Sequence, residues 1–206
     1  MSALAIAATA FVLIFPIELP DKTFIATLVL ATRYKPLAVW VGVTAAFFVQ
    51  TIVACTLGGL LARLPRTPVE VVAGLLFLVG AIILWRGAAH AEAEEAETEH
   101  EFAAKARAGV HGWRAVGASF LVLFVAEWGD LSQLLTAGLV VRYNAPVPVG
   151  IGAFLALATV SALGAVLGRT LLKRIRLGTL HRVGAGLCLL MAGLTALQVA
   201  GVDLVA

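Results

Sequence analysis

Six long apolar stretches restrict the fold of this chain more than any other feature. A helix needs about 20 mainly apolar residues to cross a bilayer. The stretches that approach this length are residues 3–31, 36–62, 69–85, 115–141, 147–168 and 183–202. In lipid every backbone polar group needs an internal partner, so such stretches fold as helices. The sequence therefore predicts an all-α integral membrane protein with six transmembrane helices.

The composition supports this class. The chain is 61% hydrophobic and 13% charged, whereas soluble domains are roughly 45–50% apolar and about 25% charged. The formal net charge of +3 then indicates membrane topology rather than a nucleic-acid surface. Cys55 and Cys188 lie in apolar runs without ligand-like spacing, which is typical of small buried hydrophobic residues. We expect the lipid bilayer as a partner and no nucleic acid.

The basic residues predict an orientation. Of the 14 Lys and Arg outside the first segment, 11 fall on one side of the predicted bundle and three on the other. Short loops rich in Lys and Arg stay in the cytoplasm. Both termini should therefore lie outside, with the Glu-rich stretch 87–113 in the cytoplasm. The N-terminal stretch has no basic region before its apolar run, so we expect no cleaved signal peptide.

The two halves of the chain resemble each other at an offset of 109 residues. The matching pairs are Glu18-x-x-Asp21 with Glu127-x-x-Asp130, and Arg33-Tyr34 with Arg142-Tyr143. Each half holds three predicted helices, and an odd number makes the halves insert with opposite orientation. Many secondary transporters are built from such inverted repeats. We predict a first repeat over 1–86, an acidic cytoplasmic linker over 87–113 and a second repeat over 114–206.

Four acids lie deep in apolar segments, and all of them belong to the repeated motif. They are Glu18, Asp21, Glu127 and Asp130. An ionised side chain at the bilayer centre costs at least ~3 kcal/mol, so such residues usually mark a transport pathway. Positions i and i+3 share a helix face, and the repeat would bring both pairs together. A structural ion pair with Lys22 is an alternative for the first motif only, because Leu131 stands there in the second.

The ligand chemistry favours a hard divalent cation. Thr23 and Ser132 follow the motif acids and add hydroxyl oxygens. Oxygen ligands suit Ca²⁺, Mn²⁺ and Mg²⁺, whereas thiolate and imidazole ligands suit Zn²⁺ and Cu. Gln50 and Gln133 could add carbonyl oxygens or could join helices by hydrogen bonds. Crowded carboxylates in a low dielectric cannot all be ionised at once, so protons and the cation compete for one site. This competition predicts metal–proton antiport.

At these residues the chain resembles the calcium/manganese–proton antiporter family of Golgi, thylakoid and bacterial membranes, whose signature is E-x-G-D-[K/R]-[T/S] repeated twice. The resemblance implies that the four motif acids bind the cation, assisted by Thr23 and Ser132. It also implies export of Mn²⁺ or Ca²⁺ from the cytosol against inward proton flow, without enzymatic chemistry or a cofactor. We expect a bacterial plasma-membrane location.

The chain departs from this signature at two positions. Pro20 replaces the first glycine, and Leu131 replaces the second basic residue. Pro20 lacks an N–H and its ring crowds the carbonyl four residues earlier, so the helix should unwind near Glu18 and free backbone carbonyls for the site. Gly129 in the second motif predicts a softer break. Lys22 has no counterpart in the second motif, so we expect it to modulate selectivity or proton stoichiometry.

The leading hypothesis is a secondary transporter of Mn²⁺, with Ca²⁺ next. Two alternatives stay open from the sequence. One is an exporter of organic cations such as basic amino acids, in which the carboxylates bind an ammonium group. The other is a membrane scaffold subunit that transports nothing. The Glu- and His-rich stretch is expected to be a solvated linker, with metal concentration as its alternative role.

Overall fold

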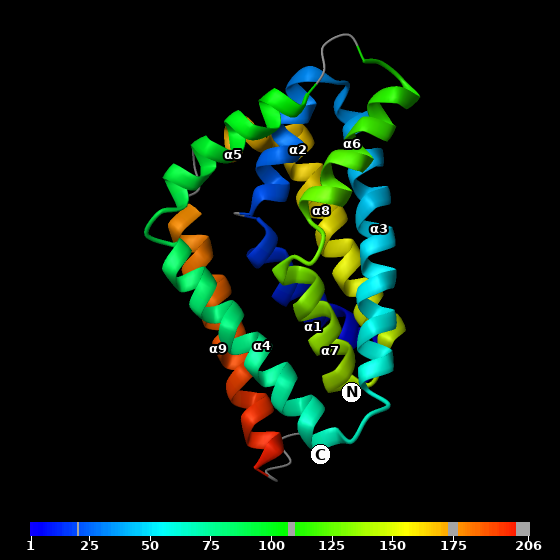
Figure 1. Cartoon of the computed structure of the whole chain (residues 1–206), viewed down its shortest axis with the longest axis vertical. Coiled ribbons are helices and arrows are strands. Elements are labelled where there is room, and N and C mark those ends of the chain that lie inside the picture. The colour runs from blue at the N-terminus through cyan, green and yellow to red at the C-terminus, as the bar shows by residue number, and fades with distance from the viewer. Residues whose placement is uncertain (20, 107–109, 173–176, 201–206) are drawn as a thin grey trace.

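The computed structural model describes residues 1–19, 21–106, 110–172 and 177–200, and all regular secondary structure within them is α-helical. Figure 1 shows an elongated helical bundle. Its helices are α1 (Ala3–Glu18), α2 (Lys22–Arg33), α3 (Pro36–Leu61), α4 (Arg66–Gly87), α5 (Ala91–Lys105), α6 (Trp113–Ala126), α7 (Leu131–Tyr143), α8 (Pro146–Leu172) and α9 (Leu177–Val199). The predicted all-α class is confirmed.

Two of the predicted spans are broken helices. The first apolar stretch forms α1 and α2, which meet at 67°, and the fourth forms α6 and α7, which meet at 71°. The helices α3, α4 and α8 are individually long and apolar enough to cross a membrane, and the two bent pairs raise this number to five. The apolar part of α9 over His181–Leu197 is shorter. Spanning helices are therefore confirmed, and a total of six stays a prediction.

The two ends of the bundle hold different parts of the chain. The N-terminus and the end of α9 lie at one end of the bundle, and α5 with the start of α6 lies toward the other (Figure 1). Which end faces the cytoplasm stays a prediction. Four of the basic residues behind that expectation lie outside the described residues: Arg107, Lys173, Arg174 and Arg176.

The two halves of the chain interlock. Helix α3 packs on α6 and α7, whereas α8 packs on α1 and α2. Glycines make these crossings close: a Cβ on Gly42 would collide with the Val116 carbonyl of α6, and one on Gly152 with the Ala7 carbonyl of α1. A Cβ on Gly164 would lie 3.0 Å from the carbonyl oxygen of Phe24 in α2. Small residues allow such approach between membrane helices, so each long helix rests on a broken helix of the other half.

Helix α5 occupies the predicted linker and packs against α2 and α9. Among its described side chains, Thr98 and Phe102 are buried, as is Ala106 directly after the helix, and the three are spaced four apart along one helical face. The predicted linker is thus solvated on one face, where Glu97, Glu99 and Glu101 are exposed, and packed on the other. A few apolar residues at helical spacing, Phe102 above all, are enough to dock an otherwise acidic helix.

Candidate cation site

The two helix breaks have the same local hydrogen bonding. In each, the backbone N–H of the motif Asp donates to the carbonyl of the motif Glu three residues earlier, at 3.1 Å for Asp21 to Glu18 and 3.4 Å for Asp130 to Glu127. The Asp carboxylate then caps the next helix. Asp21 Oδ1 accepts from the backbone N of Lys22 at 2.7 Å, and Asp130 Oδ2 accepts from the backbone N of Ser132 at 3.3 Å. Aspartate at this position stabilises a helix start.

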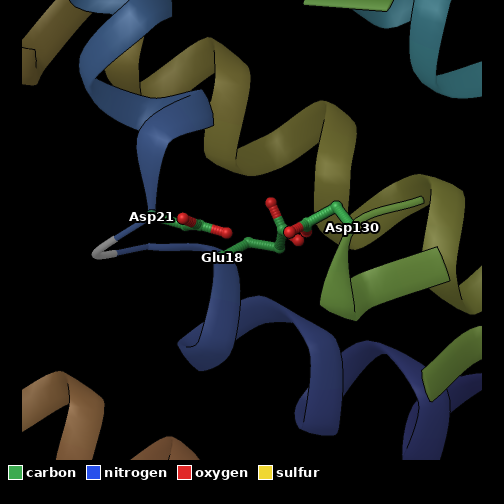
Figure 2. A group of neighbouring side chains, drawn as sticks. All are labelled: Glu18, Asp21 and Asp130. Carbon is green, nitrogen blue, oxygen red and sulfur yellow. The ribbon is translucent and has the colours of Figure 1, made fainter. Parts of the chain in front are cut away.

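Three carboxylates from the two breaks meet in space. Glu18, Asp21 and Asp130 each offer one oxygen, and these oxygens all lie within 4.8 Å of one another. Figure 2 shows the carboxyl groups of Glu18 and Asp130 side by side, with that of Asp21 directed toward them from the start of α2. Oxygens bound to one Ca²⁺ at about 2.3–2.6 Å are at most about 5 Å apart. One ion could therefore contact all three without rearrangement of the backbone.

The fourth motif acid lies beside this group rather than within it. Glu127 is buried, and it interacts electrostatically with the other three motif acids and with Lys22. Its Oε1 has no hydrogen-bond partner among the described residues. The structure thus brings all four predicted acids into one electrostatic neighbourhood, and three of them to ligand-sharing distance.

Glu18 is the most isolated from water of the four acids. Its side chain is 1% exposed, and neither carboxylate oxygen has a hydrogen-bond partner among the described residues. A buried carboxylate without partners is costly, and needs a proton or a cation to be stable. The hydroxyl of Ser132 is a neighbour of Glu18, and that of Thr23 is a neighbour of Glu127. Each motif therefore places its hydroxyl next to the glutamate of the other motif.

The two glutamines hold the second break together. Gln133 Nε2 donates to the Glu127 carbonyl at 2.8 Å, and Gln133 Oε1 accepts from the Gly129 N–H at 3.3 Å. From α3, Gln50 Nε2 donates to the Phe124 carbonyl at 3.1 Å. Both carbonyls lie where α6 ends, and that of Glu127 also accepts from the Asp130 N–H. These bonds fit the second of the two expected roles, that of joining helices.

The second break is not the softer one. It bends by 71°, compared with 67° for the first, so the expectation drawn from Gly129 is wrong. Gly129 has φ +78°, a conformation that glycine adopts without steric cost, and the second break bends the chain as much as the first does. Pro20, on which the prediction for the first break rested, lies outside the described residues.

Lys22 and Leu131 occupy the same motif position in different surroundings. Lys22 is exposed at the start of α2, where its charge acts on Glu127 in the site and on Glu101 of α5. A hydrogen bond from Lys105 and its charge hold the pKa of Glu101 below the ordinary value, and the charge of Lys22 adds a smaller effect. Leu131 instead packs beside Gly80 of α4, near the Cys188 sulfur. Its position is apolar and half-buried, so a lysine would be partly removed from water there.

Two threonines extend the repeat beyond the predicted residues. The hydroxyl of Thr27 donates to the Thr23 carbonyl and that of Thr136 donates to the Ser132 carbonyl, both at 2.7 Å. Both threonines are buried, and they stand 109 residues apart like the motif acids. This offset was the sequence signal that could have found them.

An all-helical bundle with apolar spans, two broken helices and buried carboxylates at the breaks defines the class of integral membrane transport proteins. Within this class the chain belongs to the family described as divalent cation/proton antiporter GDT1, whose model matches residues 6–92 and 115–202. The two matched ranges leave out most of α5. The family consists of transporters, not enzymes.

Relatives of the chain occur in bacteria and plants. It is 34% identical over 183 residues to a GDT1-like protein of Synechocystis sp., covering 85% of this chain and 88% of that protein. It is 30% identical to GDT1-like protein 4 of Oryza sativa subsp. indica, covering 81% of this chain and 64% of the relative. It is 31% identical to the chloroplastic protein PAM71 of Arabidopsis thaliana, covering 93% and 56%. No solved structure matches the chain significantly.

Proposed function

We propose that this protein exports a divalent cation from the cytosol in exchange for protons, and that the ion binds where the two helix breaks meet. The observation that supports this most is the group of Glu18, Asp21 and Asp130, whose oxygens lie within 4.8 Å of one another. The direction of transport rests on the family signature that both motifs resemble.

Mn²⁺ is the first candidate for the transported ion, with Ca²⁺ next. Carboxylates and hydroxyls supply only oxygen ligands, which suit both ions. Among the described residues, the group contains neither cysteine nor histidine. Glu127 and the hydroxyls of Thr23 and Ser132 complete the coordination once the ion is present, and we assign Gln50 and Gln133 the weaker, indirect role of holding the break.

Exchange follows from competition for the same oxygens. Glu18, Asp21, Glu127 and Asp130 cannot all carry negative charge in a site from which water is excluded. Protons neutralise them when the ion leaves, and an arriving ion displaces those protons. Lys22 modulates this balance, because its charge acts on Glu127 from the edge of the site.

Flux in proteoliposomes tests the proposal. The purified chain is reconstituted with an internal pH dye, and Mn²⁺, Ca²⁺ and Mg²⁺ are added in turn against an imposed pH gradient. We expect proton movement with Mn²⁺, a smaller signal with Ca²⁺, and loss of both in Asp130→Asn. Asparagine caps helices as well as aspartate does, so this variant removes the charge while it retains the start of α7. Glu99→Gln on the exposed face of α5 is the matched control.

The alternatives give different outcomes in the same assay. An exporter of organic cations would move protons with arginine or lysine and ignore Mn²⁺. A scaffold subunit would show no flux with any solute, and Asp130→Asn would then behave like the unaltered chain. Either result would overturn the proposed function.

A further inference from the structure

A groove of about 690 Å³ lies between α3 and α8, away from the carboxylates. Its walls are mainly apolar, and the residues that form them include Phe48, Ile52, Leu60, Val147, Ile151 and Phe154. Several of these side chains are half or more exposed, so the groove is open toward the surrounding bilayer. The rings of Phe48 and Phe154, which both line the groove, meet edge to face at 5.5 Å.

The opposite end of the groove is polar and positively charged. Arg63, just after α3, and Asn144, at the end of α7, line it there. Both side chains are exposed. The Arg63 guanidinium forms no hydrogen bond or ion pair within the described part of the chain. An unpaired guanidinium at the end of an apolar groove matches an anionic headgroup above an acyl chain.

The length of the groove also fits a lipid. Phe48 and Arg63 are 15 residues apart along α3, or roughly 22 Å at 1.5 Å per residue. One leaflet with its headgroups is about 20–22 Å thick, half of the full bilayer. We propose that this groove binds one anionic phospholipid, with its phosphate at Arg63 and an acyl chain directed toward Phe48 and Phe154.

The floor of the groove is a contact between the two halves of the chain. A Cβ on Gly150 of α8 would lie 2.9 Å from the Cys55 sulfur of α3. Since α3 packs on α6 and α7, and α8 on α1 and α2, a lipid here touches both helices that support the broken ones. A second copy of the chain is the competing occupant. A two-fold contact centred on the end of the groove at Arg63 would bring the Arg63 charges of both copies together. A lipid phosphate would instead neutralise the single Arg63 charge.

Native mass spectrometry of the purified full chain tests the proposal. The protein is equilibrated with equal amounts of phosphatidylglycerol and phosphatidylcholine, and the retained lipids are counted. We expect one phosphatidylglycerol in preference to phosphatidylcholine. Arg63→Gln should reduce that retention about fivefold, the contribution of one basic residue near an anionic surface. Gly59→Phe should prevent retention of either lipid, because Gly59 lines the groove and a side chain there meets open space.

Two controls lie outside the groove, near the start of α6. Arg114→Gln removes an exposed charge, and Gly117→Phe adds a ring where a Cβ also meets no atom within 4 Å. Both should retain phosphatidylglycerol like the unaltered chain. Equal retention of the two lipids, or an unchanged Arg63→Gln, overturns the proposal. So does a lipid-free dimer that Gly59→Phe dissociates, since the occupant is then a second copy. Lipid retention requires no transport, so it can fail or succeed independently of the proposed function.

Discussion

In the break between α1 and α2, Asp21 restarts the helix and an exposed lysine follows it; in the break between α6 and α7, Asp130 restarts the helix and a packed leucine follows it. The bends differ by only a few degrees, at 67° and 71°. The second break has a glycine at φ +78°. Two glutamine amides donate hydrogen bonds to backbone carbonyls there, those of Phe124 and Glu127. The two motifs therefore share the glutamate and the aspartate that caps the next helix. They differ in the residue after the aspartate, which is charged in the first motif only, and in the glycine and glutamines that support the second turn.

The largest expected effect separates the two glutamates. Glu18 belongs to the group of oxygens within 4.8 Å of one another, and Glu127 lies beside it. Glu18→Gln should therefore lower apparent Mn²⁺ affinity roughly 100-fold and Glu127→Gln roughly 10-fold, since the number of charged ligands shifts the affinity of oxygen sites over several decades. The measurement is the Mn²⁺ dependence of proton movement in proteoliposomes. Equal losses would show that the two motifs contribute identically.

The next test exchanges the residues that follow the aspartates. Leu131→Lys would place an ammonium group near Cys188 between α4 and α9. Leu131 is half-buried among apolar side chains, and a polar group placed in apolar surroundings costs about 1–3 kcal/mol. We therefore expect the free energy of unfolding to fall by about 2 kcal/mol. Lys22→Leu changes an exposed side chain and should stay within about 0.5 kcal/mol. Thermal unfolding in detergent measures both. A stable Leu131→Lys protein would mean that the second motif accepts the family's basic residue.

The hydrogen bonds of Gln133 and Gln50 at the second break predict that loss of either glutamine lowers stability, by different amounts. Gln133→Leu removes two hydrogen bonds, to the Glu127 carbonyl and from the Gly129 N–H, whereas Gln50→Leu removes the one to the Phe124 carbonyl. Each hydrogen bond contributes about 0.5–1.5 kcal/mol to stability, so Gln133→Leu should be the more destabilising of the two. Thr56→Val is a control, because its hydroxyl bonds only within α3. If both glutamine variants match this control, the amides do not support the break.

The sequence predicted which acids lie close together better than it predicted the turns that bring them there. Charged residues in apolar segments are rare enough to identify Glu18, Asp21 and Asp130 as partners, and the 109-residue offset predicted that the two pairs meet. The offset could not show that Glu127 lies beside the group, because a shift of a few ångströms depends on side-chain packing across both halves. The sequence also could not predict that α3 and α8 each pack on the broken helix of the other half, because such close contacts depend on which glycines face a backbone carbonyl.

The linker and the second break show where residue type alone misleads. Six glutamates between 87 and 113 indicate a solvated segment, yet Phe102 is buried in the contact of α5 with its neighbours. One aromatic side chain with small neighbours on the same face outweighs charges that can stay in water on the other face. Likewise the residue types predict a softer break at glycine than at proline. The positive φ permitted to glycine, rather than its flexibility, sets the angle.

The smallest expected effect concerns that glycine and tests how the second break is made. Alanine at position 129 would have to adopt φ +78°, which costs an L-residue about 1–2 kcal/mol, although space for the Cβ is open. Gly129→Ala should therefore lower the free energy of unfolding by this amount. Gly117→Ala, in regular helix and equally open, should raise it by up to about 1 kcal/mol. Opposite signs in thermal unfolding would support a break held by left-handed backbone. Equal stabilisation by both alanines would mean that the Gln133 and Gln50 hydrogen bonds, rather than the glycine, determine the bend.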